Sequence, residues 1–355
     1  MSQSSDESFK GDAFSQSLID KLRRHPKRIV FTDGADERVL RVAAEMVRLE
    51  VGIPVLLGKA DEIHGLAASL GTDMRYIKVL EPATAADQPL FCEYLKRIER
   101  YRGVELANAC EVVGQPHQFG AMMIQYGQAD ALVGGNASLP AAVFRPLLHL
   151  VKPLPDVPRV FSVAILNGGE LPHFGNDGVL FLGDCGLNPD PSIEQLAAIA
   201  VETGKLARIY FGRRPRVVLL SHSTKGSAET KEARKMRGAT ELARQRVDPE
   251  EVEIDGELQA DVALDPAAAE VKMPGSPLER AADVLVFPNL DAAHITLKML
   301  QHVGGAQVYG QMILGLARPA AQVPRTVGLS SLLGTALAVG VEAIKYHELY
   351  PDGEV

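Results

Sequence analysis

Short apolar, β-branched segments alternate with helix-forming segments along most of this chain, and that alternation constrains the fold more than any other feature. Residues 28–31 are strand-like, and residues 37–49 then place apolar side chains at the three- and four-residue spacing of a helix. The same pattern predicts further strands and helices, over 53–57, 77–80 and 129–133 and over 60–70 and 88–101 respectively. Strands separated by helices pair in parallel, so we predict an α/β fold with helices on both faces of the sheet.

A cluster of prolines (Pro153, Pro155 and Pro158) between two apolar segments is typical of a crossing between domains. A second α/β unit follows, with strands predicted over 160–165, 179–182, 217–220 and 284–287. Its clearest helix spans 192–211, where Ser192 and Gln195 match a capping box. We therefore predict two three-layer α/β/α domains with largely parallel sheets and a cleft between them. Domain I comprises 1–155 plus 305–355, including a returning helix near 331–343, and domain II comprises 156–304.

Composition excludes several classes of protein. A net charge of -8, 5% aromatic residues and no tryptophan disfavour a nucleic-acid-binding surface. No apolar stretch approaches the roughly 20 residues that cross a bilayer, and the polar, acidic start is unlike a signal peptide. Cys92, Cys110 and Cys185 have no metal-site spacing, so we interpret them as buried thiols in a reducing compartment. These features predict a cytoplasmic protein without a membrane or nucleic-acid partner and without a metal.

The loop 221–227 follows the apolar run 216–220 and precedes helix-forming sequence. Hydroxyl groups, N–H groups freed by a glycine turn and the positive end of a helix together bind small oxyanions, and a lysine adds a mobile charge. A polar turn after a strand is the simpler alternative. The candidate phosphate-binding residues are Ser223, Thr224, Lys225, Gly226 and Ser227.

Similar polar clusters follow other predicted strands, at 32–38, 134–136, 183–191 and 255–261. Each alone is compatible with a turn or a helix start. Their recurrence at strand ends favours a ligand site, because ligands of open α/β sheets bind beyond the carboxyl ends of the strands. We take Asp184, Asn188, Asp255 and Glu257 as further candidate substrate-binding residues.

The segments 183–191, 220–227, 255–259, 274–277 and 287–290 stand in the order and spacing of the phosphate acetyl/butyryltransferase family, which this chain resembles over nearly its whole length. The resemblance implies reversible transfer of a short acyl group between coenzyme A and inorganic phosphate, usually by a homodimer with its active cleft between two α/β domains. Coenzyme A is then a substrate, and no tightly bound cofactor or metal is required. By the same resemblance Arg145 contacts coenzyme A, and Arg325 faces the charge that develops in the transition state.

The sequence departs from the family in its last active-site segment. The family's serine before the arginine is Pro324 here, and the aspartate six residues after the arginine, a candidate base for the thiol, is Ser331. Loss of such a base costs on the order of a hundred- to ten-thousand-fold in rate. His294, His222 and Asp184 are candidate replacements. Further substitutions, which we interpret as making the cleft more apolar, fall at 138–140, at Ala293 and at Leu314.

Two other functions remain open at this point. A catalytically impaired module that binds coenzyme A esters in a regulatory role would explain the lost base. A decarboxylating hydroxyacid dehydrogenase shares the scaffold type, but the chain lacks a Gly-x-Gly-x-x-Gly fingerprint for a dinucleotide. Arg97, Arg100 and Arg102 are predicted to lie on a solvated helix face, or alternatively to meet the 3′-phosphate of coenzyme A.

Overall fold

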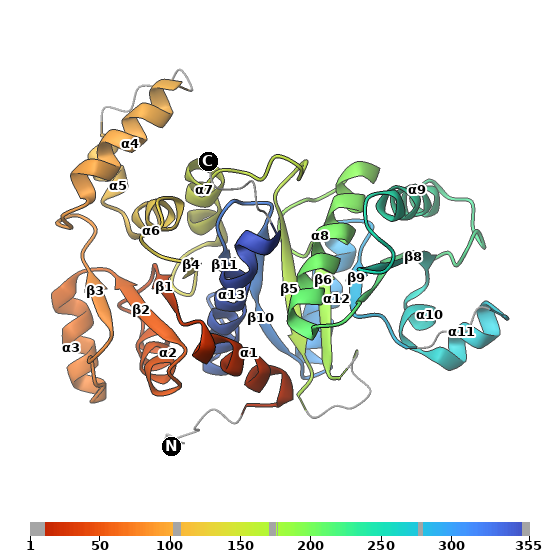
Figure 1. The fold of residues 1–355 in the computed structure, drawn as a ribbon, viewed down its shortest axis with the longest axis horizontal. Helices are drawn as coiled ribbons and strands as arrows, with labels where there is room; N and C mark the ends of the chain where they lie inside the picture. The colour runs from red at the N-terminus through yellow and green to blue at the C-terminus, as the bar shows by residue number, and fades with distance from the viewer. Residues whose placement is uncertain (1–10, 102–107, 170–174, 176, 276–279, 350–355) are drawn as a thin grey trace.

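One mixed sheet of eleven strands runs through the protein, in the order β3-β2-β1-β4-β11-β10-β5-β6-β9-β7-β8 (Figure 1). The computed structural model describes residues 11–101, 108–169, 175, 177–275 and 280–349. The strands are β1 (Lys27–Phe31), β2 (Gly52–Leu57), β3 (Lys78–Leu80), β4 (Ala131–Gly134), β5 (Phe161–Asn167), β6 (Val179–Gly183), β7 (Arg216–Leu220), β8 (Glu253–Leu258), β9 (Val284–Val286), β10 (Gln307–Leu314) and β11 (Ala320–Gln322).

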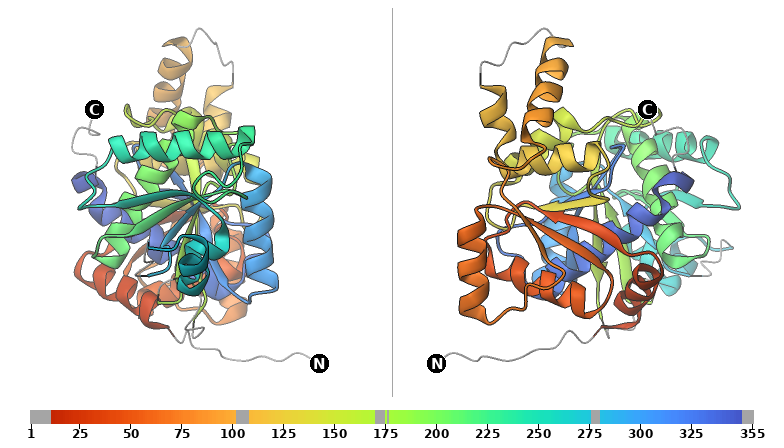
Figure 2. Two further views of the ribbon diagram at one scale, coloured as in Figure 1. Left: turned by 90° about the vertical axis from the view of Figure 1, so that its right-hand side faces the viewer. Right: turned by 60° about the vertical axis from the view of Figure 1, so that its left-hand side comes forward.

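Helices cover both faces of this sheet (Figure 2). They are α1 (Ala13–Arg24), α2 (Glu37–Arg48), α3 (Ala60–Leu70), α4 (Gln88–Tyr101), α5 (Ala109–Val113), α6 (Pro116–Gln125), α7 (Pro140–Leu150), α8 (Ile193–Phe211), α9 (Lys231–Gln245), α10 (Ala260–Leu264), α11 (Pro266–Lys272), α12 (Leu290–His302) and α13 (Leu329–Leu349). None of those described is long and apolar enough to cross a bilayer.

The prediction of an α/β fold with a mostly parallel sheet is confirmed, but the two domains do not have separate sheets. Strands β1 to β4 and β11 are parallel, as are β6, β9, β7 and β8. Between these sets β10 and β5 pair antiparallel from Gln307↔Asn167 to Leu314↔Phe161, across the boundary predicted from sequence. The sheet is continuous because β10, which follows the second unit in sequence, returns to pair between β11 and β5.

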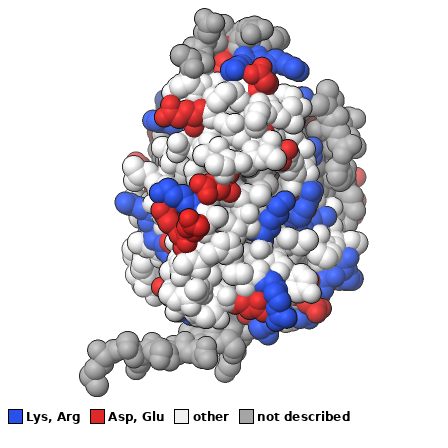
Figure 3. Space-filling view, turned by 90° about the vertical axis from the view of Figure 1, so that its left-hand side faces the viewer, with Lys and Arg blue, Asp and Glu red and all other residues white. Residues whose placement is uncertain are grey.

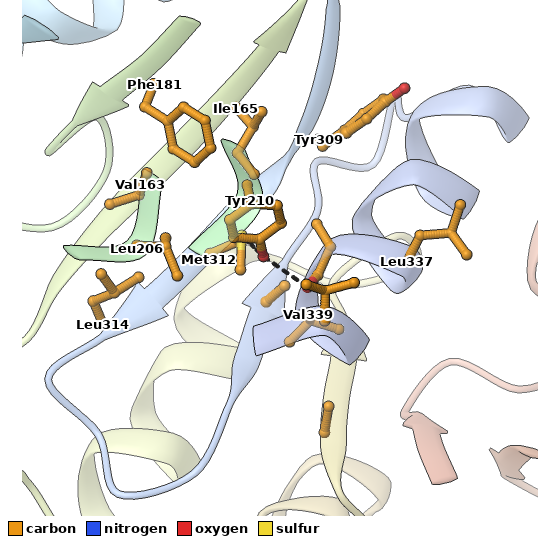
Figure 4. Packing of buried hydrophobic residues seen from close by; sticks show 14 of the residues in the cluster. Val163, Ile165, Phe181, Leu206, Tyr210, Tyr309, Met312, Leu314, Leu337 and Val339 are labelled. Carbon is orange, nitrogen blue, oxygen red and sulfur yellow. Dashed lines mark hydrogen bonds between the residues drawn. The ribbon is translucent and has the colours of Figure 1, made fainter. Parts of the chain in front are cut away.

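Three apolar clusters hold the layers together. The largest runs along one face of the whole sheet, beneath α1, α2, α13, α8 and α9. Tyr210 of α8 lies within it and donates a 2.7 Å hydrogen bond to the Ala338 carbonyl of α13, so the polar atom of a buried ring is satisfied (Figure 4). The opposite face carries two separate clusters, one under α4 to α7 and one under α10 to α12. The apolar core on this second face is therefore split into two clusters, whereas the core on the first face is continuous.

Local sequence signals placed the predicted helices well, although α1, α5, α6 and α7 were not among them. Residues 60–70 and 88–101 form α3 and α4 as predicted, and the Ser192/Gln195 capping box opens α8. The returning C-terminal helix is α13, which packs against α1, α2 and β10. Three strands, β8, β10 and β11, were not predicted. β8 is rich in polar residues and β11 is very short, so neither has the apolar run used to assign strands.

The interpretation of all three cysteines as free thiols was wrong. Cys92 on α4 and Cys110 on α5 form a disulfide, because α5 packs against α4 and brings together residues that are 18 apart in sequence. Cys185 is a free buried thiol, and burial raises its pKa. Sequence spacing alone does not show which helices pack together, so it gave no sign of this pairing.

The surface of the N-terminal half carries small patches of both signs separated by uncharged residues (Figure 3). Binding to a nucleic-acid backbone requires a continuous basic surface, and this face does not provide one. On α4 the guanidinium of Arg97 lies 5.8 Å from the centre of the Tyr94 ring. Arg102, the polar start of the chain and residues 276–279 lie outside the described residues.

Candidate active site

The carboxyl ends of β1, β4 and β11 meet at one edge of the sheet, where three polar loops begin. Asp33, directly after β1, accepts a 2.8 Å hydrogen bond from the Gly135 N–H after β4. Gly135 has a φ of 107°, and a Cβ there would lie 2.7 Å from the Val323 carbonyl oxygen after β11. Only glycine fits this conformation and this close approach, so the three loops come into direct contact.

Arg38 of α2 ties these loops together. Its guanidinium donates to the carbonyl oxygens of Asn136 (2.7 Å), Arg325 (2.8 Å) and Val327 (3.0 Å). It also forms a two-point ion pair with Asp36. Burial opposes ionisation of Asp36, but the bonds from Arg38 outweigh it and hold the pKa of that carboxyl below its usual range. The loop that carries Arg325 is thus held by charge-assisted hydrogen bonds to its backbone.

The side chain of Arg325 is exposed and makes no hydrogen bond or ion pair with any described residue. Its fixed backbone and unpaired guanidinium leave a positive charge available to a ligand. Pro324 precedes it, and Ser331 lies in the first turn of α13, where its carbonyl accepts from Thr335. Neither Pro324 nor Ser331 carries a carboxylate that could act as a base.

Asp184 and Asn188 lie together in the loop after β6, where Asp184 organises the chain. Both carboxylate oxygens are occupied by hydrogen bonds. The donors are the Ser162 N–H and hydroxyl, the backbone N–H groups of Gly186, Leu187 and Asn188, and the Asn188 amide. The Asn188 amide also donates to the Val160 carbonyl. Asp184 therefore acts as an internal anchor, and its lone pairs are not free for a thiol proton.

The loop 221–227 folds into a tight turn over the end of β8. Lys225 and Gly226 both have positive φ, at 46° and 84°. The carboxylate of Glu257 accepts from the Gly226 N–H (2.8 Å) and from the Ser223 hydroxyl (2.9 Å), while Arg237 completes the contact at 3.1 Å. Burial opposes ionisation of Glu257, but these bonds outweigh it and lower its pKa to about 2. Glu257 occupies the position that an anion would take in this turn.

The other predicted members of this loop are also bonded within it. The Ser227 hydroxyl accepts from the Thr224 N–H at 2.9 Å, and the Thr224 hydroxyl accepts from the Gln259 N–H at 3.1 Å. Lys225 forms an ion pair with Asp255 and donates to the Gly256 carbonyl. The structure therefore brings Ser223–Ser227, Asp255 and Glu257 into one cluster, with most of their donors already used.

Arg145 of α7 lines a hollow between α4, α5, α6 and α7 with a volume of about 540 Å³, part of it open to solvent. Apolar side chains (Leu95, Val112, Pro146 and Leu150) form its walls. Glu99, which is buried, is bonded to His149 beside Arg145. Arg145 itself is exposed and has no hydrogen bond or ion pair with a described residue. Apolar walls with one unpaired cation suit a ligand with an anionic group.

The two halves of the sheet touch through Gly186 and Gln311. A Cβ on Gly186 would overlap the Gln311 side chain, and Gln311 pairs with Gln322, two residues before Pro324. Three antiparallel pairings lie between the two sets of parallel strands and reverse the strand direction. The carboxyl ends of the two sets are therefore not on one common edge of the sheet.

The three candidate replacement bases differ in how they are held. Asp184 is fully bonded, as described above. His222 Nε2 lies 3.2 Å from the Thr230 hydroxyl, and His294 Nδ1 lies 3.1 Å from the Cys185 carbonyl oxygen. The interpretation of Leu314 and Ala293 as cleft residues was wrong, because both are packed inside apolar clusters.

One polar residue near Asp33 was missed by sequence analysis. His117, in the first turn of α6, has a buried Nδ1 with no hydrogen-bond partner among the described residues. Burial lowers the pKa of His117, and the charge of Asp33 partly offsets this. No strand-end motif includes His117, so only the packing of α6 against β4 and the end of β1 could have indicated it.

Comparison with known proteins agrees with this architecture. The sequence profile described as phosphate acetyl/butaryl transferase matches residues 13–339. The chain belongs to this family. It is 36% identical over 330 residues to a phosphate acetyltransferase of Thermoanaerobacterium thermosaccharolyticum, covering 92% of this chain and 98% of that protein. The predicted family, with its acyltransferase function, is confirmed.

Solved structures give the same result for the fold of this family member. The EutD phosphotransacetylase from Staphylococcus aureus matches with a TM-score of 0.82 at 32% identity, over 93% of this chain and 98% of that one. A phosphotransacetylase from Streptococcus pyogenes matches with a TM-score of 0.84 at 30% identity, over 94% and 98%. The continuous mixed sheet is therefore the phosphotransacetylase fold.

Proposed function

We propose that this protein catalyses the reversible reaction of acetyl-coenzyme A, or a related short-chain thioester, with inorganic phosphate to give the acyl phosphate and free coenzyme A. The observation that carries the proposal is the unpaired Arg325 guanidinium on a loop fixed by Arg38. A cation held in place before the reaction costs no reorganisation when negative charge develops beside it.

In the direction that forms thioester, the coenzyme A sulfur loses its proton and attacks the carbonyl carbon of the acyl phosphate. The C–S bond forms, a tetrahedral oxyanion develops, and the C–O bond to phosphate then breaks. Arg325 would stabilise the oxyanion and the departing phosphate. No covalent bond to the protein is needed, so positioning and electrostatics supply the catalysis.

Coenzyme A would bind as a substrate, with Arg145 pairing with one of its phosphates at the mouth of the α4–α7 hollow. The cluster of Ser223–Ser227, Asp255 and Glu257 is proposed to contact inorganic phosphate from the second half, with Asp184 and Asn188 shaping the adjoining loop. A phosphate at Gly226 would have to replace Glu257 as the acceptor of its N–H.

We further propose two functional units, 1–155 plus 305–355 and 156–304, that share the sheet and face each other across the divided side. The two separate apolar clusters on that side support this division. The protein is also proposed to act as a cytoplasmic homodimer. An exposed apolar stripe on α12, formed by Ile295, Met299 and Val303, supports self-association, and sedimentation of the Met299→Asp variant against the unchanged protein tests it.

The deciding experiment is an assay of the purified protein with acetyl, propionyl and butyryl phosphate in the presence of coenzyme A, followed by thioester absorbance. Turnover with at least one acyl phosphate is expected. The alternative of an impaired binding module is favoured only by Pro324 and Ser331. It predicts no turnover with any of the three, together with calorimetric binding of coenzyme A.

A further inference from the structure

The chemistry proposed above requires a group that takes the thiol proton, and position 331 has no carboxylate to do so. Of the three candidate replacements, Asp184 is saturated with donors, and His222 and His294 contact Thr230 and the Cys185 carbonyl oxygen. The Asp255 and Glu257 carboxylates are tied to Lys225 and Arg237. These groups also lie in the second half of the molecule, whereas Arg325 lies in the first. A base should therefore be sought at the ends of β1, β4 and β11.

The packing of α6 places His117 at that edge. A Cβ on Gly120 would lie 3.0 Å from the Thr32 methyl, so α6 presses directly on the end of β1. His117 is three residues before Gly120 and so lies one turn further along the same face of the helix. This is consistent with the charge of Asp33, the next residue after Thr32, acting on the imidazole.

We propose that His117 is the general base that accepts the coenzyme A thiol proton in this protein, in place of the carboxylate missing at position 331. The S–H bond breaks, the proton passes to the His117 imidazole, and the sulfur attacks the acyl carbon. In the reverse reaction the imidazolium returns the proton to the departing thiolate. The inference rests on the proposed function, since it names a residue for that reaction.

Three observations support the role. Nδ1 is buried and has no partner among the described residues, and an imidazole in this state calls for a ligand or a functional explanation. Burial lowers the pKa of His117, so the ring is neutral and able to accept a proton near pH 7. Asp33 faces it from the loop after β1 and would stabilise the imidazolium that forms, while Asp36 is neutralised by Arg38.

The first test is the pH dependence of kcat/KM for the unaltered protein. A neutral histidine base predicts that activity falls as the pH drops through a pKa below the usual 6.5 of histidine, and above that pKa activity should be flat. An acid limb near pH 4 would assign the role to a carboxylate such as Asp33, and the proposal would be overturned. Absence of any turnover in this protein would instead remove the proposed function itself.

The second test is the His117→Gln variant, with His64→Gln on the exposed face of α3 as the matched control. Turnover of His117→Gln should fall 10²- to 10⁴-fold with loss of the acid limb, while the KM for coenzyme A changes little. Adding Ser331→Asp to His117→Gln should restore part of the rate. An unchanged acid limb would contradict the proposal, and so would an effect confined to KM without rescue by Ser331→Asp. If the His117→Gln variant does not fold, the pH profile of the unaltered protein decides the question.

Discussion

The Arg38 guanidinium on α2 donates a 2.8 Å hydrogen bond to the carbonyl oxygen of Arg325, a residue 287 positions later in the chain. One arginine thus holds the backbone of another whose own side chain is unpaired. Two like charges would repel if their guanidinium groups met, but here only the backbone of Arg325 is engaged. The ion pair of Arg38 with Asp36 cancels its charge locally, so the field at the site comes mainly from Arg325.

Replacing Arg38 should therefore reduce catalysis without removing a group that contacts substrate. Lysine carries its donors on a single nitrogen, so it cannot reproduce all the bonds that the planar fork of Arg38 makes to Asp36, Asn136, Arg325 and Val327. Hydrogen bonds to charged groups contribute about 1.5–3 kcal/mol, so we expect Arg38→Lys to lower kcat about 10- to 100-fold. Steady-state kinetics should show the loss in kcat more than in KM, with Arg41→Lys on the same helix as the control. An effect equal to that of Arg41→Lys would argue against this positioning role.

Arg325→Ala should nearly abolish turnover while leaving the fold intact. The side chain is exposed and makes no hydrogen bond or ion pair with described residues, so its removal should change the melting temperature by little. Loss of a fixed donor to an oxyanion costs about 10²- to 10³-fold in kcat. Arg75→Ala, at an exposed pair with Asp73, is the control. Undiminished activity would show that a group other than Arg325 stabilises the charge of the transition state.

The phosphate-loop hypothesis predicts that Lys225→Ala combined with Ser227→Ala weakens phosphate binding by at least tenfold, since a point charge and a loop-closing hydroxyl are both lost. The same change also breaks the contacts to Asp255 and Thr224. Calorimetry with inorganic phosphate and thermal melting should therefore be measured together. A lower melting temperature with unaltered phosphate affinity would mean that Glu257 holds this turn for structural reasons only.

Sequence could predict what local chemistry determines. The capping box of α8 could be predicted because Ser192 and Gln195 are three residues apart and need no tertiary partner. The ends of the predicted strands could be placed because each apolar run is followed directly by a polar loop. β8 could not be predicted in this way, since its half-buried Asp255 pairs with the buried Arg216 of the neighbouring strand, and that pairing depends on register rather than on local pattern.

The candidate site shows the same limit. Motif spacing gathered Ser223, Lys225 and Glu257 correctly, but it could not show that the Glu257 carboxylate takes the loop's donors for itself. It also named Arg325 without indicating that Arg38 holds its backbone. His117 was missed because its importance comes from where α6 lies against β4 and the end of β1, which only the assembled fold determines.

Glu342 on α13 gives the chain a pH-dependent stability that lies apart from the active site. Its side chain is buried, one carboxyl oxygen has no partner among the described residues, and burial raises its pKa to about 8. In the unfolded chain a glutamate has a pKa of about 4.3, so between these values the folded state holds a proton that the unfolded state releases. Stability is therefore expected to fall as the pH rises from about 4.3 to about 8.

Glu342→Gln should remove this penalty, because the amide stays neutral at every pH and has nearly the same shape. At pH 8 the variant should be more stable than the unchanged protein, by up to about 5 kcal/mol at 1.36 kcal/mol per pKa unit, and at pH 4 the two should unfold almost alike. Denaturant melts at both pH values measure the difference, with exposed Glu62→Gln as the control. Equal gains at pH 4 and pH 8 would show that packing, rather than ionisation of Glu342, determines the effect.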